Sequence, residues 1–362
     1  MQFGTIFSNF GLMSFSSKLI AWYEKYGREL PWRQTSDPYI IWLSEIILQQ
    51  TRVEQGLPYF QTFVTQLPTV RDFAEAEEDF ILRLWQGLGY YSRARNMHKA
   101  AKTVMSNFNG AFPTSYEEVI QLPGIGAYTA SAISSFSSNE VRAVVDGNVY
   151  RVLSRVFGID TDINSGTGKK QFQELADSLI STSQPGLYNQ AIMDFGATVC
   201  KPKQPLCAAC IFADQCDAFA TNRVDLLPRK VKTTKIRKRY FHYFIIRRGA
   251  EIMVAKRPQG DIWANLYEFP MLETTAPILV EELQNSDAYI AHFDSATPIP
   301  LGVPIKQVLS HQHIYAQFYL LPENTQIKNK KTDWEYILSD NLDKLAKHKL
   351  IFSFLRTDNF PN

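Results

Sequence analysis

Between about Ser14 and Phe219, hydrophobic residues recur at intervals of three and four, which places them on one face of a helix. The stretch 39–59 is also rich in strong helix formers, and a pair of glycines at 87 and 89 interrupts the pattern. The sequence therefore predicts an all-helical region, with helices at 19–26, 39–59, 80–85, 94–108, 116–122, 129–136, 149–157, 169–180 and 188–197.

The pattern changes after Asn222. Segments 240–247, 251–256 and 314–321 are enriched in β-branched and aromatic residues and are separated by turns, which predicts strands. Two late helices are predicted at 333–338 and 340–345. The chain is therefore expected to contain a helical domain at 1–221 and a smaller α+β domain at 240–362, without an internal repeat.

A basic segment joins these two domains at residues 222–239. It contains seven basic residues and no acidic one between its positions 229 and 239: Arg229, Lys230, Lys232, Lys235, Arg237, Lys238 and Arg239. Such a segment is either a solvated linker or one that follows the phosphates of a nucleic acid, and the sequence leaves both interpretations open.

The composition is that of an ordinary globular protein. Of 362 residues, 45% are hydrophobic and 20% are charged, which allows each domain to bury a core. The formal net charge is only +2, so any affinity for a polyanion must come from local patches. No apolar run is long enough to cross a bilayer, and Met1–Lys18 lacks the composition of a targeting segment. We therefore expect an intracellular, cytoplasmic protein.

All four cysteines lie in one short stretch, with the spacing C-x6-C-x2-C-x5-C: Cys200, Cys207, Cys210 and Cys216. A secreted disulfide framework would distribute its cysteines through a smaller chain, so this grouping favours a metal centre. Four-cysteine zinc sites remain an alternative, although they generally show two close pairs and only one is present here.

A tight hairpin is predicted at Leu122-Pro123-Gly124-Ile125-Gly126. Proline disfavours helical geometry in the residue before it, and the two glycines allow a sharp turn with close backbone approach. A helix that starts after this turn presents unpaired N–H groups, which bind phosphate without reading sequence. The alternative is an ordinary corner between two helices.

Two acidic residues are candidates for catalysis. Glu45 lies in a segment whose helical wheel surrounds it with apolar residues, so we expect burial to raise its pKa and suit it to general acid catalysis. The alternative is an ion pair with Arg52 or another cation. Asp146 follows two valines and precedes Gly147, where it could also be a helix N-cap or part of a turn.

In combination, these motifs resemble the MutY family within the helix-hairpin-helix DNA glycosylases. The segment Ser44-Glu45, followed after three residues by Gln49-Gln50-Thr51, is similar to a motif of that family, and the resemblance covers nearly the whole chain. It implies an all-α helix-hairpin-helix glycosylase domain with an iron–sulfur loop, followed by an α+β Nudix or MutT-like domain. It also implies a monomer that removes adenine mispaired with 8-oxoguanine or guanine from double-stranded DNA, nucleoid-associated if bacterial.

The resemblance assigns catalytic roles. It implies that Glu45 protonates the leaving adenine and that Asp146, supported by Asn148, stabilises the positive charge that develops on the sugar. Tyr128 occupies the position of the lysine that forms a Schiff base in related glycosylase/lyases, so hydrolysis without strand cleavage is expected. The implied DNA contacts are Arg33 and Leu48 at the adenine, Gln50 and Tyr90 as wedges in the duplex, and Gly124 and Gly126 at a phosphate.

The resemblance extends to the cysteine loop and the second domain. The cysteine spacing is similar to that of the family's [4Fe–4S] cluster, whose loop would carry Lys201 and Lys203 toward phosphates. Ile262–Pro270 resembles the MutT-like domain, but no Glu-rich metal box follows, so nucleotide hydrolysis is not expected. The family reads 8-oxoguanine with a Phe-Ser-His loop, and the matching residues here are Leu309, Ser310 and His311, with leucine replacing the aromatic residue.

Two other functions are compatible with parts of this pattern. One is a glycosylase of the same superfamily that removes thymine opposite guanine, which the second domain and the surroundings of Glu45 disfavour. The other is a non-catalytic iron–sulfur protein that binds damaged DNA, which the presence of both carboxylates disfavours. The sequence therefore favours an adenine-specific DNA N-glycosylase.

Overall fold

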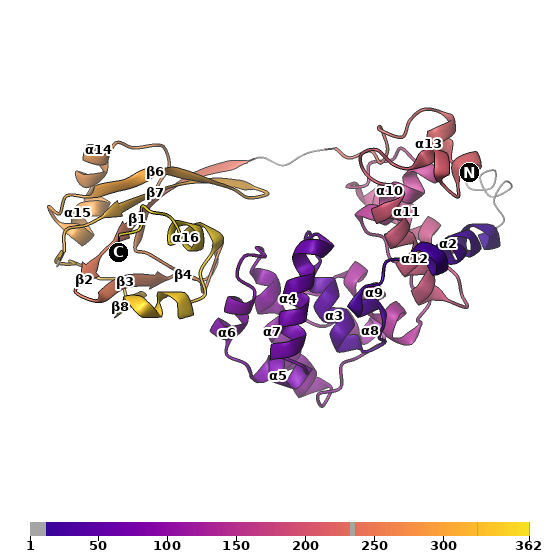
Figure 1. Cartoon of the computed structure of the whole chain (residues 1–362), viewed down its shortest axis with the longest axis horizontal. Coiled ribbons are helices and arrows are strands. Elements are labelled where there is room, and N and C mark those ends of the chain that lie inside the picture. The colour runs from indigo at the N-terminus through magenta and orange to yellow at the C-terminus, as the bar shows by residue number, and fades with distance from the viewer. Residues whose placement is uncertain (1–11, 232–235, 324, 362) are drawn as a thin grey trace. The chain divides into compact units, whose positions relative to one another are not determined.

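A computed structural model describes residues 12–231, 236–323 and 325–361 and divides the chain into two compact units (Figure 1). Unit 1 comprises Met1–Ala74 and Lys99–Lys232, and unit 2 comprises Glu75–His98 and Thr233–Asn362. Unit 1 is helical, and unit 2 combines sheets with helices, as the sequence predicts. Within the described ranges, no helix combines the length and the apolar character needed to span a lipid bilayer.

The helices occupy most of unit 1 and also decorate unit 2. Short 3-10 turns are labelled η. The α-helices are α2 (Leu12–Tyr26), α3 (Pro38–Ile47), α4 (Val53–Gln66), α5 (Val70–Glu75), α6 (Glu78–Leu84), α7 (Ser92–Asn107), α8 (Tyr116–Val119), α9 (Ala127–Ser138), α10 (Gly147–Val156), α11 (Gly166–Leu179), α12 (Pro185–Thr198), α13 (Asp217–Ala220), α14 (Val280–Gln284), α15 (Asp287–Phe293) and α16 (Lys349–Phe354). The 3-10 turns are η1 (Pro31–Arg33), η2 (Cys207–Ala209), η3 (Ala213–Gln215) and η4 (Ser339–Lys344).

Helix ends in unit 1 follow local chemistry. Asp37 caps α3 by accepting a hydrogen bond from the backbone N–H of Tyr39, and Pro38 occupies the first helical position, where its missing N–H is not needed. Helix α9 is followed by its C-cap residue Asn139, which adopts the left-handed conformation with a φ of 54°. These caps fix the ends of two helices that contact each other and, as described below, line the same cavity.

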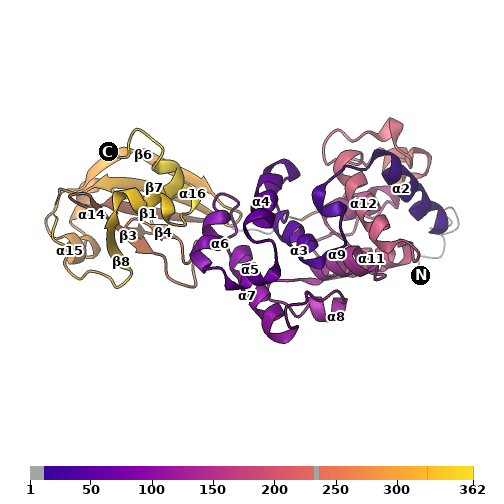
Figure 2. The ribbon, with the colours of Figure 1, turned by 60° about the horizontal axis from the view of Figure 1, so that its bottom comes forward.

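The apolar core of unit 1 joins α2, α10, α11 and α12. Helix α2 packs against α12 (Figure 2). Helix α12 also passes close to the start of α10, where a Cβ atom added to Gly196 would lie 2.7 Å from the Cβ of Asn148. Glycine at this position therefore allows the two helices to approach, which brings α12 beside the N-terminus of α10.

Unit 2 contains two four-stranded sheets. In the first, the strand order is β5-β1-β7-β6, with β1 and β7 parallel and the outer pairs antiparallel. In the second, β3 pairs with β2, β4 and β8. The strands are β1 (Arg237–Ile245), β2 (Arg247–Arg248), β3 (Glu251–Lys256), β4 (Tyr267–Glu268), β5 (Met271–Thr274), β6 (Ile299–Val308), β7 (Gln312–Leu320) and β8 (Trp334–Leu338).

The helical segment 75–98 groups with unit 2 although it lies within the first part of the sequence. Lys256 on β3 forms an ion pair with Asp79 at 2.9 Å, and the guanidinium of Arg95 donates to the carbonyl oxygen of Ala264 at 2.8 Å. A continuous domain was expected at 1–221. The structure differs, because polar side chains of segment 75–98 contact residues far along the chain, in unit 2.

Three predicted elements differ from the structure. The prediction of a helix at 333–338 is wrong, because Trp334–Leu338 form β8, which pairs antiparallel with β3. The stretch 39–59 contains two helices, α3 and α4, separated at Leu48–Arg52, where Gln50 has a left-handed φ of 56°. The predicted helix at 340–345 is a 3-10 helix at Ser339–Lys344.

The expected linker is shorter in the structure. Residues 222–231 belong to unit 1, where the carbonyl oxygen of Arg229 accepts a hydrogen bond from the backbone of Ile163. At the other end, Arg237–Arg239 already form the start of β1. Lys232 and Lys235, which were also expected in the linker, lie outside the described residues.

Candidate active site

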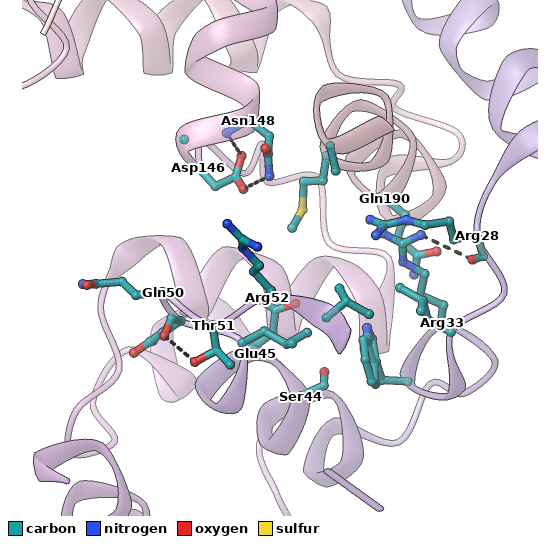
Figure 3. Close-up of a pocket in the computed structure, with 18 of the residues that line it drawn as sticks. Arg28, Arg33, Ser44, Glu45, Gln50, Thr51, Arg52, Asp146, Asn148 and Gln190 are labelled. Carbon is teal, nitrogen blue, oxygen red and sulfur yellow. Dashed lines mark hydrogen bonds between the residues drawn. The ribbon is translucent and has the colours of Figure 1, made fainter. Parts of the chain in front are cut away.

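Unit 1 contains a cavity of about 620 Å³ that is lined by residues from α3, α9, α10 and α12 and from the loop before α3. Glu45 from α3, Tyr128 from α9, and Asp146 with Asn148 at the start of α10 all line it. Figure 3 shows Asp146 and Asn148 together on one side, with Arg28, Arg33 and Gln190 grouped on another. The two predicted catalytic carboxylates therefore open onto one shared space.

Glu45 is buried, with 9% of its surface exposed. The hydroxyl group of Tyr128 donates a hydrogen bond to its Oε2 atom at 3.0 Å. Burial raises the pKa of Glu45 from 4.5 to about 7, and the charge of Asp146 adds to this rise, whereas the Tyr128 hydrogen bond and the charge of Arg33 oppose it. Within residues 12–231, 236–323 and 325–361, no ion pair joins Glu45 to Arg52, so the alternative drawn from the sequence is not observed.

Asp146 is the N-cap of α10. Its Oδ1 atom accepts hydrogen bonds from the backbone N–H groups of Asn148 and Val149, and its Oδ2 atom accepts one from the Asn148 side chain, each at 2.8 Å. Burial has the largest effect and raises the pKa of Asp146 above its ordinary value, whereas these N–H donors and the charge of Arg151 oppose the rise. The capping interaction predicted as an alternative is thus present, and it orients the carboxylate at the cavity wall.

The two carboxyl groups differ in the protonation state that their surroundings favour. Glu45 has a pKa of about 7, so it carries a proton in a large fraction of molecules at neutral pH. Asp146 receives three N–H donors, which favour its charged form. A pair of acids with this difference can protonate a leaving group and stabilise a neighbouring positive charge.

Other residues singled out in the sequence lie at the same cavity. Arg33 and Leu48 line it, and so does Gln50, which is exposed and follows α3. The left-handed backbone of Gln50 is uncommon outside glycine and often marks functional positions. The structure therefore brings together seven of the predicted residues at this cavity: Arg33, Glu45, Leu48, Gln50, Tyr128, Asp146 and Asn148.

The predicted hairpin joins α8 to α9. Gly124 has a left-handed φ of 79°, and Gly126 is the N-cap of α9. A Cβ atom added to Gly126 would meet nothing within 4 Å, so the backbone here is open to an approaching molecule. The first N–H groups of a helix lack partners within that helix, and they are available at this exposed turn. Because Tyr128 is in the first turn of α9, the hairpin also fixes the tyrosine in the cavity.

A second cavity, of about 440 Å³, lies within unit 2 and contains the other predicted DNA contacts. Leu309, Ser310 and His311 form the turn between β6 and β7 and line this cavity together with Tyr90. The hydroxyl groups of Tyr90 and Ser310 are hydrogen-bonded to each other. Tyr90 is 47% exposed and has a left-handed φ of 47°. Ser310 therefore lies in a turn that contacts the proposed wedge.

The four cysteines line a third cavity, which belongs to unit 1. None of them is in a disulfide. The backbone N–H of Phe212 donates to the sulfur of Cys210 at 3.4 Å, and the guanidinium of Arg155 lies 3.5 Å from the sulfur of Cys200. In the part of the chain that the structure describes, no three His, Cys, Asp or Glu side chains are arranged to hold a single metal ion.

Comparisons with known proteins match both parts of the chain. Residues 43–179 match the HhH-GPD superfamily of base excision DNA repair proteins, and residues 242–357 match the NUDIX domain. The helical part thus carries the fold of a DNA repair domain, and the second part carries that of a NUDIX domain.

Similar proteins identify the family. The chain is 34% identical to an adenine DNA glycosylase of Buchnera aphidicola subsp. Baizongia pistaciae over 88% of this chain and 90% of the relative. The chain belongs to the adenine DNA glycosylase family. It is also 32% identical to the adenine DNA glycosylase of Rattus norvegicus, over 85% of this chain and 70% of the relative. A solved thermostable thymine-DNA glycosylase is 27% identical with a TM-score of 0.55, but the match covers only 59% of this chain and 99% of the solved one.

The structure adds residues to this adenine DNA glycosylase site that the sequence did not reveal. Arg151 donates to the side-chain oxygen of Asn148 at 2.9 Å and to the carbonyl oxygen of Cys200 at 2.7 Å, and so links the candidate catalytic cavity to the cysteine loop. Its position three residues after Asn148, on the same helix face, was a usable signal. Arg28 and Gln190 also line the cavity, but no sequence pattern marks them.

Proposed function

We propose that this adenine DNA glycosylase hydrolyses the N-glycosidic bond of adenine opposite 8-oxoguanine or guanine in duplex DNA, without cutting the DNA backbone. The observation that carries the proposal is the shared cavity of Glu45 and Asp146, with the Tyr128 hydroxyl on Glu45. A cavity of about 620 Å³ has room for a flipped purine nucleoside.

The proposed reaction begins with a proton on Glu45. Transfer of this proton to a ring nitrogen of adenine makes the base a better leaving group, and the bond between the sugar C1′ and the base N9 then breaks with its electron pair leaving on the base. The Asp146 carboxylate stabilises the oxocarbenium-like sugar. Water adds to C1′ and loses a proton, so the products are adenine and an abasic sugar in an intact strand.

The absence of a lysine at the hairpin position supports hydrolysis over strand cleavage. A glycosylase that also cuts the backbone uses an amine to form a Schiff base with C1′. Here the corresponding side chain is Tyr128, whose hydroxyl donates to Glu45. A phenol cannot form a Schiff base, so its contribution is to orient the acid in the cavity.

The second cavity supports recognition of the partner base. Ser310 has a hydroxyl group that can donate to or accept from the edge of 8-oxoguanine. This hydroxyl is hydrogen-bonded to the hydroxyl group of Tyr90, a residue that is exposed to solvent. Trp263 from the same cavity supplies an aromatic surface, whereas the turn itself carries Leu309. We assign Ser310 and His311 to the lesion and Tyr90 to the duplex beside it.

The cysteine loop fits a [4Fe–4S] cluster. All four cysteines line one cavity, and N–H groups from Phe212 and Arg155 point at the sulfurs of two of them, as donors do around iron–sulfur clusters. Burial raises the pKa of Cys210 to about 11, and a bound cluster would supply the positive charge that stabilises its thiolate form. The cluster would hold this loop in place, with Lys201 and Lys203 beside it.

The proposed substrate can be tested with duplexes that contain A opposite 8-oxoguanine, A opposite G, or T opposite G. Alkaline heating after incubation should reveal cleavage at A in the first two and none at T. Without alkali the strand should stay intact, and borohydride should trap no major covalent adduct. Ser310→Ala should reduce the preference for 8-oxoguanine over guanine. Cleavage only at T, or efficient trapping, would contradict the proposal.

Replacement of one cysteine should remove the iron. We expect purified wild-type protein to contain about four iron atoms per chain, as a [4Fe–4S] cluster requires, and Cys207→Ser to lose most of them. Ala209→Ser is the matched control, because it introduces serine into the same turn and keeps every sulfur. Zinc in place of iron in the wild-type protein would show that the four cysteines form a zinc site and not an iron–sulfur cluster.

A further inference from the structure

An ion cluster lies beside the candidate catalytic cavity, and the proposed reaction gives it no role. Asp194 on α12 is 0% exposed. Its Oδ1 atom lies 2.6 Å from Nη2 and 2.7 Å from Nε of Arg28, and 3.0 Å from Nη1 of Arg33. Its Oδ2 atom accepts a hydrogen bond from the backbone N–H of Arg28 at 3.0 Å. One buried carboxylate thus binds two arginines that line the cavity.

This cluster fixes the direction in which Arg33 points. The Nη1 atom of Arg33 also donates to the carbonyl oxygen of Arg28 at 3.4 Å, and its guanidinium carbon lies 5.5 Å from the centre of the Tyr23 ring. Only 12% of the Arg33 side chain is exposed. A buried carboxylate such as Asp194 is stable only when its charge is paired. The two arginines are therefore held firmly on the α12 side of the cavity.

Arg33 is also the cation whose charge acts on Glu45. Its field lowers the pKa of Glu45, against the larger effect of burial. The other charged or titratable groups that face Glu45 come from two further elements: Tyr128 from α9 and Asp146 from the start of α10. The cavity lining also includes four more charged residues: Arg28, Arg52, Glu54 and Arg151.

A guanidinium released from α12 would have Glu45 as a partner within the same cavity. Arginine and carboxylate form strong paired hydrogen bonds, which hold the carboxylate in its charged form. A Glu45 side chain paired in this way carries no proton for the leaving base. The position of Arg33 therefore decides whether the cavity contains a usable acid.

We propose that Asp194 is a positioning residue for base excision: its carboxylate keeps the Arg33 guanidinium on α12, so that Glu45 retains Tyr128 as its hydrogen-bond partner and delivers a proton to the base. Asp194 does not line the cavity and acts through Arg33. The inference rests on the proposed function, because the proton transfer belongs to that reaction.

The test is the pH dependence of adenine excision under single-turnover conditions with Asp194→Asn. Excision by the wild-type protein falls as the pH rises and Glu45 loses its proton. In the variant, the released Arg33 favours the charged form of Glu45, so this fall should move to lower pH by about one unit or more. Asp177→Asn is the matched control, since Asp177 is an exposed aspartate on α11 that accepts a hydrogen bond from the Gln173 side chain at 3.0 Å, and its profile should match the wild type.

The double variant Asp194→Asn/Arg33→Met separates positioning from general damage. Without the guanidinium nothing competes for Glu45, so the fall in excision should return to the wild-type pH or above it, even where DNA affinity is reduced. Equal loss of activity at every pH in Asp194→Asn would overturn the inference, and so would a shift that persists in the double variant.

If Asp194→Asn does not fold, the inference can be tested by substituting Arg33 instead. Arg33→Met alone removes the positive charge near Glu45, so the fall in excision should move to higher pH, and an unchanged profile would overturn the inference. If the wild-type protein excises adenine but the variants show none of these pH shifts, only the role of Asp194 is contradicted. Wild-type protein that excises no adenine contradicts the proposed function itself.

Discussion

Asp146→Asn should lower the rate of adenine excision by roughly 10³-fold or more, which is the loss expected when a fixed charge no longer stabilises a developing one. The substitution keeps the size of the side chain and removes its negative charge. It also places an amide NH2 group opposite either the backbone donors or the Asn148 side chain, because all three partners of Asp146 are N–H groups. A neutral asparagine therefore cannot accept all three hydrogen bonds that the Asp146 carboxylate accepts.

The same substitution should leave the protein folded. Asparagine and aspartate are comparable N-caps, so α10 keeps a capped end and the free energy of unfolding should change by about 1 kcal/mol or less. Asp37→Asn is the matched control, because Asp37 caps α3 in the same way and does not line the cavity. Excision should be measured under single-turnover conditions together with the melting temperature. Activity near the wild-type level in Asp146→Asn would rule out a carboxylate-stabilised sugar cation at this site.

Several helices could be predicted because they bury one face. The expected helix at 94–108 is observed as α7 (Ser92–Asn107), and that at 169–180 as α11 (Gly166–Leu179). Their starts were less well predicted, since a cap depends on one side chain. In α11, Ser165 supplies this cap by accepting a hydrogen bond from the N–H of Gly168.

The strand at Trp334–Leu338 could not be predicted from local pattern. Five residues are too few to distinguish a period of 2 from a period of 3.6. The strand is decided by its partner, since Trp334 lies opposite Ala255 and Leu338 opposite Glu251 in β3. Pairing between segments this far apart in the chain leaves no trace in either sequence alone.

The candidate catalytic cavity was predictable where motifs place residues on neighbouring helices. The motifs around Glu45, Tyr128 and Asp146 lie on α3, α9 and the start of α10, and the structure brings all three side chains to one cavity. Their catalytic roles stay predictions. The cluster of Asp194 with Arg28 was not predictable, because its partners are 166 residues apart and neither belongs to a recognisable motif.

The boundaries of the two units also depend on contacts that the sequence conceals. The segment 75–98 reads as part of a continuous helical domain, yet Asp79 pairs with Lys256 and Arg95 bonds to the backbone of Ala264. In the sequence, charged residues on a short helix are typical of a face exposed to solvent, and the residues with which they pair cannot be identified. Tyr90, in the same segment, therefore lies with Ser310 in unit 2.

Glu45→Gln should lower adenine excision by about 10²- to 10⁴-fold, the usual contribution of a general acid. Glutamine fills the same space and can still accept the hydrogen bond from Tyr128, but its amide has no acidic proton for the base. The matched control is Glu54→Gln. Glu54 also faces the cavity but is exposed, so this substitution should change the rate little under saturating single-turnover conditions.

The pH profile distinguishes loss of the acid from general damage to the cavity. The pKa of Glu45 is raised from 4.5 to about 7, so the protonated, active form predominates below about pH 7 and excision should fall as the pH rises through that value. In Glu45→Gln the residual rate has no such group to lose its proton, and the fall near pH 7 should disappear. If the variant were slow but kept the wild-type profile, another group would have to supply the proton. Because burial is the main cause of the raised pKa, the apolar packing around α3 is what makes this glutamate an acid at neutral pH.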